Sequence, residues 1–239
     1  MPAGWPRAVI FDMDGLMYAT EQQIQRAWDE VGPEIVGKPL GNEIYNTMGM
    51  NRALRVKYFY DTYGSDFPYE KFEKAYKACV ADMKQREGIP VKQGLFRLLA
   101  FLCEERIPAV LATGSSSFHT YENLALTRTP DIFQYVICGD MVRAAKPDPF
   151  IYELSCRKLG MQPEEVLVLE DSVNGVLAAH AAHTPVIMIP DLQKGQTSAV
   201  EDLPLAMMDS LDDVTDMLMD AQRAGCIRAP RRCSYRPDE

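Results

Sequence analysis

Short apolar segments recur along the chain and are separated by longer amphipathic ones. The first, residues 8–12, reads AVIFD and is soon followed by Gly15, which is typical of a buried strand that ends in a polar loop. Similar segments follow at residues 108–113, 135–139, 166–170 and 185–189. We therefore predict a strand at each of these five positions, buried on both faces of a sheet.

Helical periodicity fills most of the intervals between these strands. Four leucines between residues 95 and 102 share one helix face, and similar apolar stripes occur at residues 151–159, 176–182 and 211–221. Short strands that alternate with amphipathic helices form a parallel sheet with helices on both faces. The pattern thus predicts an α/β fold with a Rossmann-like parallel sheet core.

The interval between the first predicted strand and Val91 contains helical patterns but no strand. Apolar stripes at residues 24–31 and 72–83 each have the spacing of a core-facing helix, and residues 53–63 predict a third helix between them. We therefore expect an all-helical cap inserted after the first strand. The predicted division is a discontinuous core at residues 1–18 and 91–222, a cap at 19–90 with hinges near 18–21 and 88–94, and a flexible basic tail at 223–239.

Composition narrows the class of protein. Of the 239 residues, 47% are hydrophobic and 25% are charged, which is the balance of a globular chain. The net charge of −9 disfavours non-specific binding to nucleic acid. The sequence has no signal-peptide pattern, no apolar run near the roughly 18 residues that span a bilayer, and no paired cysteine motif. We expect a cytoplasmic monomer that binds neither nucleic acid nor membrane.

Polar side chains gather where the predicted strands end. In an open parallel sheet, ligands bind outside the carboxyl ends of the strands, so residues far apart in the sequence meet in one crevice. Each residue also has a structural interpretation, since acids often form turns after strands and serines often cap helices. Their joint occurrence after successive strands favours a functional site. The residues are Asp12, Asp14, Thr113, Lys146, Glu170 and Asp171.

The chemistry of this set is that of phosphoryl transfer. Carboxylates from two loops provide the oxygen ligands that Mg²⁺ prefers. Lys146 is a point cation for a phosphate, and the Thr113 hydroxyl with the amides after it can donate hydrogen bonds to phosphate oxygens. A carboxylate can also serve as nucleophile and split one difficult step into two. We therefore expect Mg²⁺ as cofactor and a phosphate group on the substrate.

With these motifs the sequence resembles the haloacid dehalogenase superfamily, in the branch that includes β-phosphoglucomutase and small sugar-phosphate phosphatases. The resemblance covers about residues 7–215, and the helical cap of that family matches the predicted insertion. It rests on the segments FDMDGLMYATE at 11–21, VLATGSSS at 110–117, AKPDPFIYELSCRKLG at 145–160 and VLEDSVNGVLAAHAA at 168–182.

The resemblance implies a role for each matching residue. Asp12 would attack phosphorus and carry an aspartyl-phosphate, while Asp14 would protonate the leaving alcohol and then activate water. Thr113 and Lys146 would hold the phosphoryl group. Mg²⁺ would be bound by the residues Asp12, Asp14 through its backbone carbonyl, Asp171, and Glu170 in or near the metal shell.

The resemblance implies a small phosphorylated metabolite as substrate, with contacts expected from two sides. Gly114 and Ser115 follow Thr113 in the phosphate-binding segment. The cap would supply the contacts that select the substrate, and its candidates are Glu21, Asn51, Arg52 and Lys57.

Three residues depart from the family pattern. Ala19 stands where an acid is usual, and Gln93 replaces a common proline before Gly94. His183 stands where a glycine typically ends the helix, and a left-handed histidine there would be strained.

Several functions remain open. In β-phosphoglucomutase a cap histidine couples closure to proton transfer, but the matching residues 21–28 read EQQIQRAW, with Ile24 at that position. Water should then compete for the intermediate, which favours a Mg²⁺-dependent phosphatase of small phosphate monoesters over a phosphosugar mutase. A receiver-like signalling domain is disfavoured by the length and the insertion. A catalytically inactive binding module is disfavoured because every core residue is present.

Overall fold

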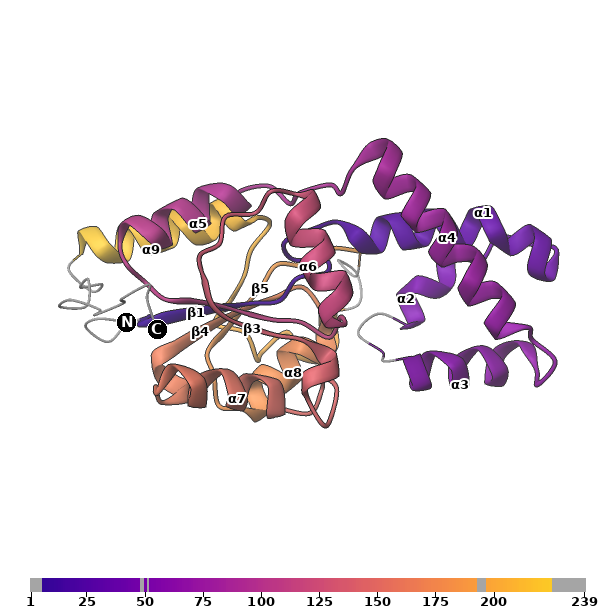
Figure 1. Cartoon of the computed structure of the whole chain (residues 1–239). Helices are drawn as coiled ribbons and strands as arrows, with labels where there is room; N and C mark the ends of the chain where they lie inside the picture. The colour runs from indigo at the N-terminus through magenta and orange to yellow at the C-terminus, as the bar shows by residue number, and fades with distance from the viewer. Residues whose placement is uncertain (1–5, 48–49, 51, 193–196, 225–239) are drawn as a thin grey trace.

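The computed structural model describes residues 6–47, 50, 52–192 and 197–224, and their core is a parallel six-stranded sheet. The strand order is β3-β2-β1-β4-β5-β6, so the first strand lies in the middle of the sheet. This arrangement confirms the predicted α/β fold (Figure 1). The strands are β1 (Ala8–Phe11), β2 (Ala109–Ala112), β3 (Phe133–Ile137), β4 (Val166–Glu170), β5 (Val186–Met188) and β6 (Ala206–Met207).

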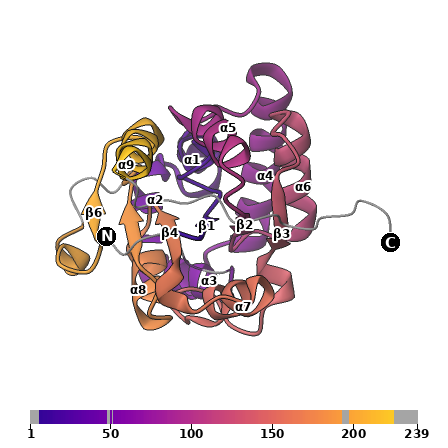
Figure 2. The ribbon, with the colours of Figure 1, turned by 90° about the vertical axis from the view of Figure 1, so that its left-hand side faces the viewer.

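Helices cover both faces of the sheet because alternate side chains of each strand point to opposite sides (Figure 2). Val9 and Phe11 of β1 pack in one apolar cluster, and Ala8 and Ile10 pack in another. The first cluster also contains residues of α5 (Leu95–Glu104) and α9 (Leu211–Arg223), and the second contains residues of α7 (Phe150–Leu159) and α8 (Val173–Ala181).

The strands differ from the predicted segments mainly at their ends. Asp12 and Thr113 lie just beyond β1 and β2, where the chain leaves the sheet with polar side chains. β3 begins at Phe133, two residues before the apolar run that predicted it. β6 was not predicted, because its two residues are too few to show a periodic pattern. α6 (Ser117–Leu126) begins at the last of the three serines at positions 115–117, and Ser116 precedes it without a side-chain capping hydrogen bond.

The chain between β1 and α5 forms helices with an apolar core of their own. Trp28 is fully buried there, and its ring centroid lies 5.4 Å from those of Phe59 and Phe72 and 5.7 Å from that of Tyr76. In Figure 1 these helices extend away from the sheet on the side of α6. They are α1 (Thr20–Val36), α2 (Ile44–Thr47), α3 (Arg52–Tyr63) and α4 (Tyr69–Glu87), and together we call them the helical insertion. The exact boundaries of 19–90 stay a prediction.

A carboxylate within the insertion ties its short segments together. Glu43, in the turn before α2, accepts hydrogen bonds from the hydroxyls of Tyr58 and Tyr63 on α3. Burial raises the pKa of Glu43, but the hydrogen bonds from the two phenols and from Asn46, together with the charge of Lys38, outweigh it, so the pKa lies below its ordinary value. The ionised form of Glu43 therefore stabilises the fold of the insertion.

The two linkers between the core and the insertion lie side by side. Tyr18 and Val91 form an antiparallel bridge. The Ala19 amide donates to the Pro90 carbonyl at 2.9 Å, and the Lys92 amide donates to the Met17 carbonyl, also at 2.9 Å. The insertion thus leaves and rejoins the core at neighbouring points, which is where the sequence predicted the hinges.

Polar contacts connect the insertion to the core on two further sides. Lys84 of α4 donates to the Asn123 side-chain oxygen on α6 at 2.8 Å and to Glu122 at 3.1 Å. Asp191, after β5, accepts from Lys92 at 2.7 Å and from Gln22 of α1 at 3.1 Å. These contacts fix the direction in which the insertion faces the end of the sheet.

The three departures from the family pattern have local structural counterparts. Ala19 precedes α1 and offers no side-chain hydrogen bond to its first turn. The Gln93 side chain donates to Asp212 at 3.1 Å at the start of α9. His183 has φ 58°, so it adopts the left-handed conformation predicted for the end of α8.

Two remaining sequence predictions concern membrane-spanning helices and the C-terminal tail. Among the residues that the structure describes, no helix combines the length and the apolar character needed to cross a bilayer. The predicted flexible tail lies, from residue 225 onward, outside the described residues, and Arg223 ends α9.

Candidate active site

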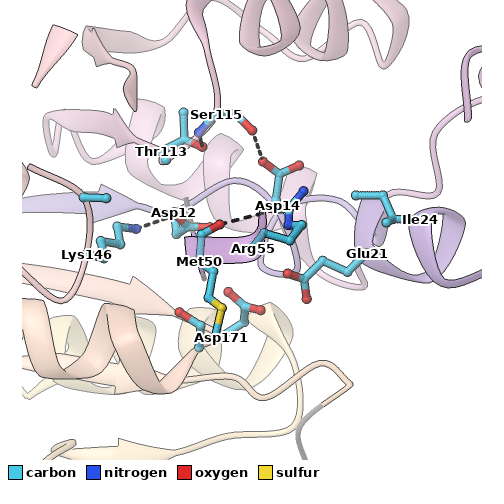
Figure 3. A pocket seen from close by; sticks show the side chains of 13 residues that line it. Asp12, Asp14, Glu21, Ile24, Met50, Arg55, Thr113, Ser115, Lys146 and Asp171 are labelled. Carbon is cyan, nitrogen blue, oxygen red and sulfur yellow. Dashed lines mark hydrogen bonds and ion pairs between the residues drawn. The ribbon is translucent and has the colours of Figure 1, made fainter. Parts of the chain in front are cut away.

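A cavity of about 210 Å³ opens where the carboxyl end of the sheet faces the helical insertion. The loops after β1, β2, β3 and β4 all reach it, as the topology of a parallel sheet requires. Figure 3 shows the side chains converging on it from both sides. From the core it is lined by Asp12, Asp14, Thr113, Gly114, Ser115, Ala145, Lys146, Asp171 and Ser172, and from the insertion side by Glu21, Ile24, Met50 and Arg55.

Asp12 and Lys146 form an ion pair at the buried end of this cavity. The Lys146 ammonium donates to Asp12 Oδ1 at 2.5 Å and to the Ala112 carbonyl at 3.3 Å. Asp12 is only 7% exposed and Lys146 only 9%. Since its surroundings exclude most water, the pair can act strongly on an anion that enters the cavity.

Glu170 holds Lys146 in place from behind the cavity wall. Its Oε1 accepts from Lys146 and from the Tyr152 hydroxyl, each at 2.6 Å. Its Oε2 accepts from the backbone amides of Asp171 at 3.0 Å and Ser172 at 3.1 Å. Both oxygens are therefore engaged, and the geometry favours Glu170 as a positioning residue more than as a direct metal ligand.

Tyr152 is a functional neighbour that the sequence analysis did not single out. It lies on α7, two residues into the helix, and its side chain is completely buried. A tyrosine at an otherwise apolar helix position is the signal that could have identified it, because a buried hydroxyl requires a partner.

Asp171 provides the best evidence that the site accommodates a cation. It is 1% exposed, yet its Oδ2 has no hydrogen-bond partner within the described residues. Carboxylate oxygens of Asp12, Glu170 and Asp171 lie within 4.8 Å of one another. Gly15 leaves room for the Asp171 carboxylate, since a Cβ at position 15 would lie 2.0 Å from Asp171 Oδ2. An unpaired buried carboxylate is costly, and a metal ion would satisfy it.

The electrostatics of the acids support the same conclusion. Burial raises the pKa of Asp12 to about 7, although Lys146 opposes the shift. Burial also holds the pKa of Asp171 well above its ordinary value, and the neighbouring carboxylates of Glu21 and Glu170 add to it. A divalent cation among these oxygens would stabilise the ionised carboxylates and so reverse both shifts.

Asp14 is held by hydroxyl groups from two different segments. Thr20, in the first turn of α1, donates to Asp14 Oδ1 at 2.6 Å, and Ser115 donates to Asp14 Oδ2 at 2.6 Å. The carboxylate is half-buried and reaches the cavity. Thr20 was not predicted as a site residue, because its contact depends on how α1 begins.

Thr113 and the two residues after it form the opposite wall. Thr113 is buried, and its hydroxyl accepts from the Ser115 amide at 3.0 Å. Its own amide donates to the Ile137 carbonyl at 3.0 Å, which ties the loop to β3. Gly114 is exposed beside them, so this segment presents backbone and hydroxyl groups to the cavity.

The insertion contributes a different set of residues from the one predicted. Glu21 lines the cavity, as expected for a substrate contact. Arg52 does not line it, because its guanidinium is held on the surface by Glu73 at 2.7 Å. Arg55, one helical turn later on α3, lies in the cavity instead. Asn51 lies outside the described residues.

These groups together can carry out phosphoryl transfer. One buried carboxylate lies beside a fixed ammonium, a second carboxylate is held near it by hydroxyls, and a third is poised for a cation. Backbone and hydroxyl donors complete the far wall. This is the combination of nucleophile, acid–base group and charge stabilisation that such a reaction requires.

Comparison with known proteins agrees with the site. Residues 6–183 match the family model described as haloacid dehalogenase-like hydrolase. The phosphorylated carbohydrates phosphatase of Thermotoga maritima is 33% identical over 179 residues, covering 73% of this chain and 81% of that relative. Hexitol phosphatase B of Escherichia coli K12 is 28% identical over 210 residues, covering 85% and 93%.

Solved structures share the fold over nearly the whole chain. CbbY from Rhodobacter sphaeroides in complex with phosphate has a TM-score of 0.73 and 25% identity, covering 87% of this chain and 96% of that one. A β-phosphoglucomutase assigned as putative, from Thermotoga maritima, has a TM-score of 0.71 and 27% identity, covering 89% and 98%. The chain belongs to the family of haloacid dehalogenase-like hydrolases, as its sequence motifs predicted.

Proposed function

We propose that this hydrolase is a Mg²⁺-dependent phosphatase that cleaves small, sugar-like phosphate monoesters through an aspartyl-phosphate intermediate. The observation that carries the proposal is the buried Asp12–Lys146 pair beside an Asp171 oxygen that has no partner in the described part of the chain. The relatives support it by their names, since two of them are a phosphorylated carbohydrates phosphatase and a hexitol phosphatase.

Asp12 and Asp14 divide the chemistry between them. The Asp12 carboxylate attacks phosphorus, the bond from phosphorus to the alcohol oxygen breaks, and that oxygen takes the proton held by Asp14. Asp14 then removes a proton from water, whose oxygen attacks the aspartyl-phosphate and releases inorganic phosphate together with free Asp12. The hydroxyl donors on Asp14 keep its carboxylate directed into the cavity for both steps.

Other residues would hold the charge of the transferring group. Lys146, positioned by Glu170, would bind one phosphoryl oxygen, and Thr113 with the amides after it would bind others. Mg²⁺ would be held by Asp12, Asp171 and the Asp14 backbone carbonyl, and when bound it would offset the negative charge between nucleophile and phosphate.

Hydrolysis is favoured over transfer to a second sugar hydroxyl. Ile24 lines the cavity from α1, at the position where the mutase resemblance would place a histidine. The histidines of the described chain lie elsewhere, with His119 on α6 and His180 and His183 at the end of α8. Ile24 provides no basic group that could couple closure of the insertion over the cavity to attack by a sugar hydroxyl. Water therefore reaches the aspartyl-phosphate.

A product analysis tests the proposal. Purified protein with Mg²⁺ is incubated with β-glucose 1-phosphate and with a panel of sugar phosphates, and products are followed by phosphorus NMR. We expect inorganic phosphate from several sugar phosphates. Glucose 6-phosphate accumulating faster than inorganic phosphate would establish a mutase, and no turnover of any phosphate ester, including p-nitrophenyl phosphate, would refute the phosphatase.

The proposal includes a cytoplasmic location. Cys79, Cys103, Cys138 and Cys156 are free thiols in the structure, and two of them are buried. Free cysteines are common in reducing compartments, which favours the cytoplasm.

A further inference from the structure

We propose that Tyr152 is a positioning residue for the reaction, which holds the Lys146 ammonium in place through Glu170 and through its own ring. The inference rests on the proposed phosphatase function and adds a residue to that site from outside the cavity. Lys146 lines the cavity and Tyr152 does not, so Tyr152 has no direct contact with a substrate there. Its effect on turnover therefore passes through Lys146.

Tyr152 brings a hydroxyl group into an apolar part of the core. Its side chain is completely buried, and it belongs to the same apolar cluster as Ile10 of β1 and Val110 of β2. Because protein interiors are closely packed, the ring cannot shift without disturbing both strands. The hydroxyl donates to Glu170 Oε1 at 2.6 Å. Glu170 is thus tied to the rigid centre of the sheet.

The two oxygens of Glu170 are held by different parts of the molecule. Oε2 accepts from the backbone amides of Asp171 at 3.0 Å and Ser172 at 3.1 Å, and from the Ser172 hydroxyl at 3.1 Å. These three donors belong to the loop that follows β4. Oε1 accepts from Tyr152 and from Lys146, each at 2.6 Å. The Tyr152 hydroxyl is therefore the donor that holds Oε1 independently of Lys146.

Lys146 is shared between two carboxylates. Its ammonium donates to Asp12 Oδ1 at 2.5 Å, to Glu170 Oε1 at 2.6 Å and, at the longer distance of 3.3 Å, to the Ala112 carbonyl. The hydrogen bond from Tyr152 offsets part of the negative charge on Oε1 and so weakens the attraction of Glu170 for the ammonium. The ammonium stays beside Asp12, where the phosphoryl group is transferred.

The ring of Tyr152 makes a second contact with the same ammonium. Lys146 Nζ lies 5.0 Å from the centroid of the ring, within the range of a cation–π interaction. Lys146 is only 9% exposed, so little water competes for this contact. Phenylalanine at position 152 would keep the ring and lose the hydroxyl. Tyr152→Phe therefore tests the hydrogen bond to Glu170 separately from the packing.

The first test is steady-state hydrolysis of p-nitrophenyl phosphate with Mg²⁺. Tyr152→Phe should lower kcat by about tenfold, as expected for one lost hydrogen bond to a charged group, and change KM by less than about threefold. The effect falls on kcat because the charge that Lys146 offsets grows in the transition state. Tyr135→Phe is the matched control, since Tyr135 lies on β3, packs against the same cluster and lines no part of the cavity. It should keep kcat within about twofold.

The second test requires no activity. The carbon–proton NMR signal of the Lys146 Cε methylene, identified by its loss in Lys146→Arg, reports the surroundings of the ammonium in protein without metal. It should shift in Tyr152→Phe, which retains the ring, and stay unchanged in Tyr135→Phe. A merely structural hydroxyl would lower the Tm and leave both kcat and this signal unchanged.

The two measurements separate failure of the inference from failure of the proposed function. The inference is overturned if Tyr152→Phe keeps kcat within about twofold of the wild type, if KM rises as much as kcat falls, or if its Lys146 signal coincides with that of the wild type. Absence of p-nitrophenyl phosphate hydrolysis by the wild type would instead overturn the proposed function. The NMR comparison would then still decide whether Tyr152 positions Lys146.

Discussion

Replacing Gly175 by alanine should destabilise the protein, although the same change in a helix interior normally stabilises. Gly175 lies in α8, where alanine is favoured over glycine by about 1 kcal/mol in the absence of other contacts. A Cβ at this position, however, would lie 1.8 Å from Glu170 Oε1 and 2.2 Å from Oε2. The Glu170 carboxylate would have to move by about an ångström or more.

The size of the effect follows from what that movement breaks. Glu170 is completely buried and its two oxygens accept hydrogen bonds from Lys146, Tyr152 and the backbone of the following loop. Disrupting a buried ion pair costs about 3–5 kcal/mol, and the helical gain of about 1 kcal/mol offsets part of it. We expect a net loss of about 3 kcal/mol, which lowers the Tm of a chain of this length by about 6–12 °C.

Thermal unfolding in EDTA, followed by circular dichroism, measures this effect without a contribution from bound metal. The double variant Gly175→Ala with Glu170→Asp is the control, because the shorter acid withdraws the carboxylate from the new methyl group. The effects of the two substitutions on the free energy of unfolding should be non-additive by more than about 1 kcal/mol. A Gly175→Ala protein that unfolds at or above the wild-type Tm would refute the reasoning, as would additivity in the double variant.

Three further predictions follow from the site and the insertion. Asp12→Asn should abolish turnover of p-nitrophenyl phosphate while the far-ultraviolet circular dichroism stays native, and retention of a substantial kcat would remove Asp12 from the nucleophile's role. Activity should be lost in EDTA, return with Mg²⁺ and be inhibited by Ca²⁺, which prefers more ligands at about 2.3–2.6 Å instead of about 2.0–2.1 Å; full activity in EDTA would contradict the metal assignment. The lowered pKa of Glu43 means that its contribution to stability is present above the unfolded value of about 4.3 and is lost as pH falls through the folded pKa. Glu43→Gln should therefore flatten the fall of Tm between about pH 5 and pH 3, and an unchanged slope would show that the two tyrosine hydrogen bonds do not matter.

The arrangement of the core could be predicted because its strands are nearly all apolar. A run such as AVIF is typical of a strand that is covered on both faces, and the polar residue that follows it then lies at the carboxyl end of the sheet. Asp12, Thr113, Lys146 and Asp171 were expected at this end because each lies in the chain that follows a predicted strand, and the structure brings them to one cavity.

The contacts made by the insertion could not be predicted in the same way. Arg52 and Arg55 both look like polar positions on α3, and which of them faces the cavity depends on how the helix is rotated against Trp28 and its neighbours. Thr20 and Tyr152 acquire their roles through partners distant in the sequence or on another element. No local pattern encodes such orientation.

The bridge between Tyr18 and Val91 has a consequence for how such a protein can change over evolutionary time. Because the two linkers are paired next to each other, the segment between them closes on itself and its length does not affect the spacing of the strands. A longer, shorter or differently folded segment could replace it while Asp12 and Lys146 keep their positions. Under the proposed function, the reaction and the choice of substrate can therefore be altered independently, one by the sheet and the other by the module attached at this bridge.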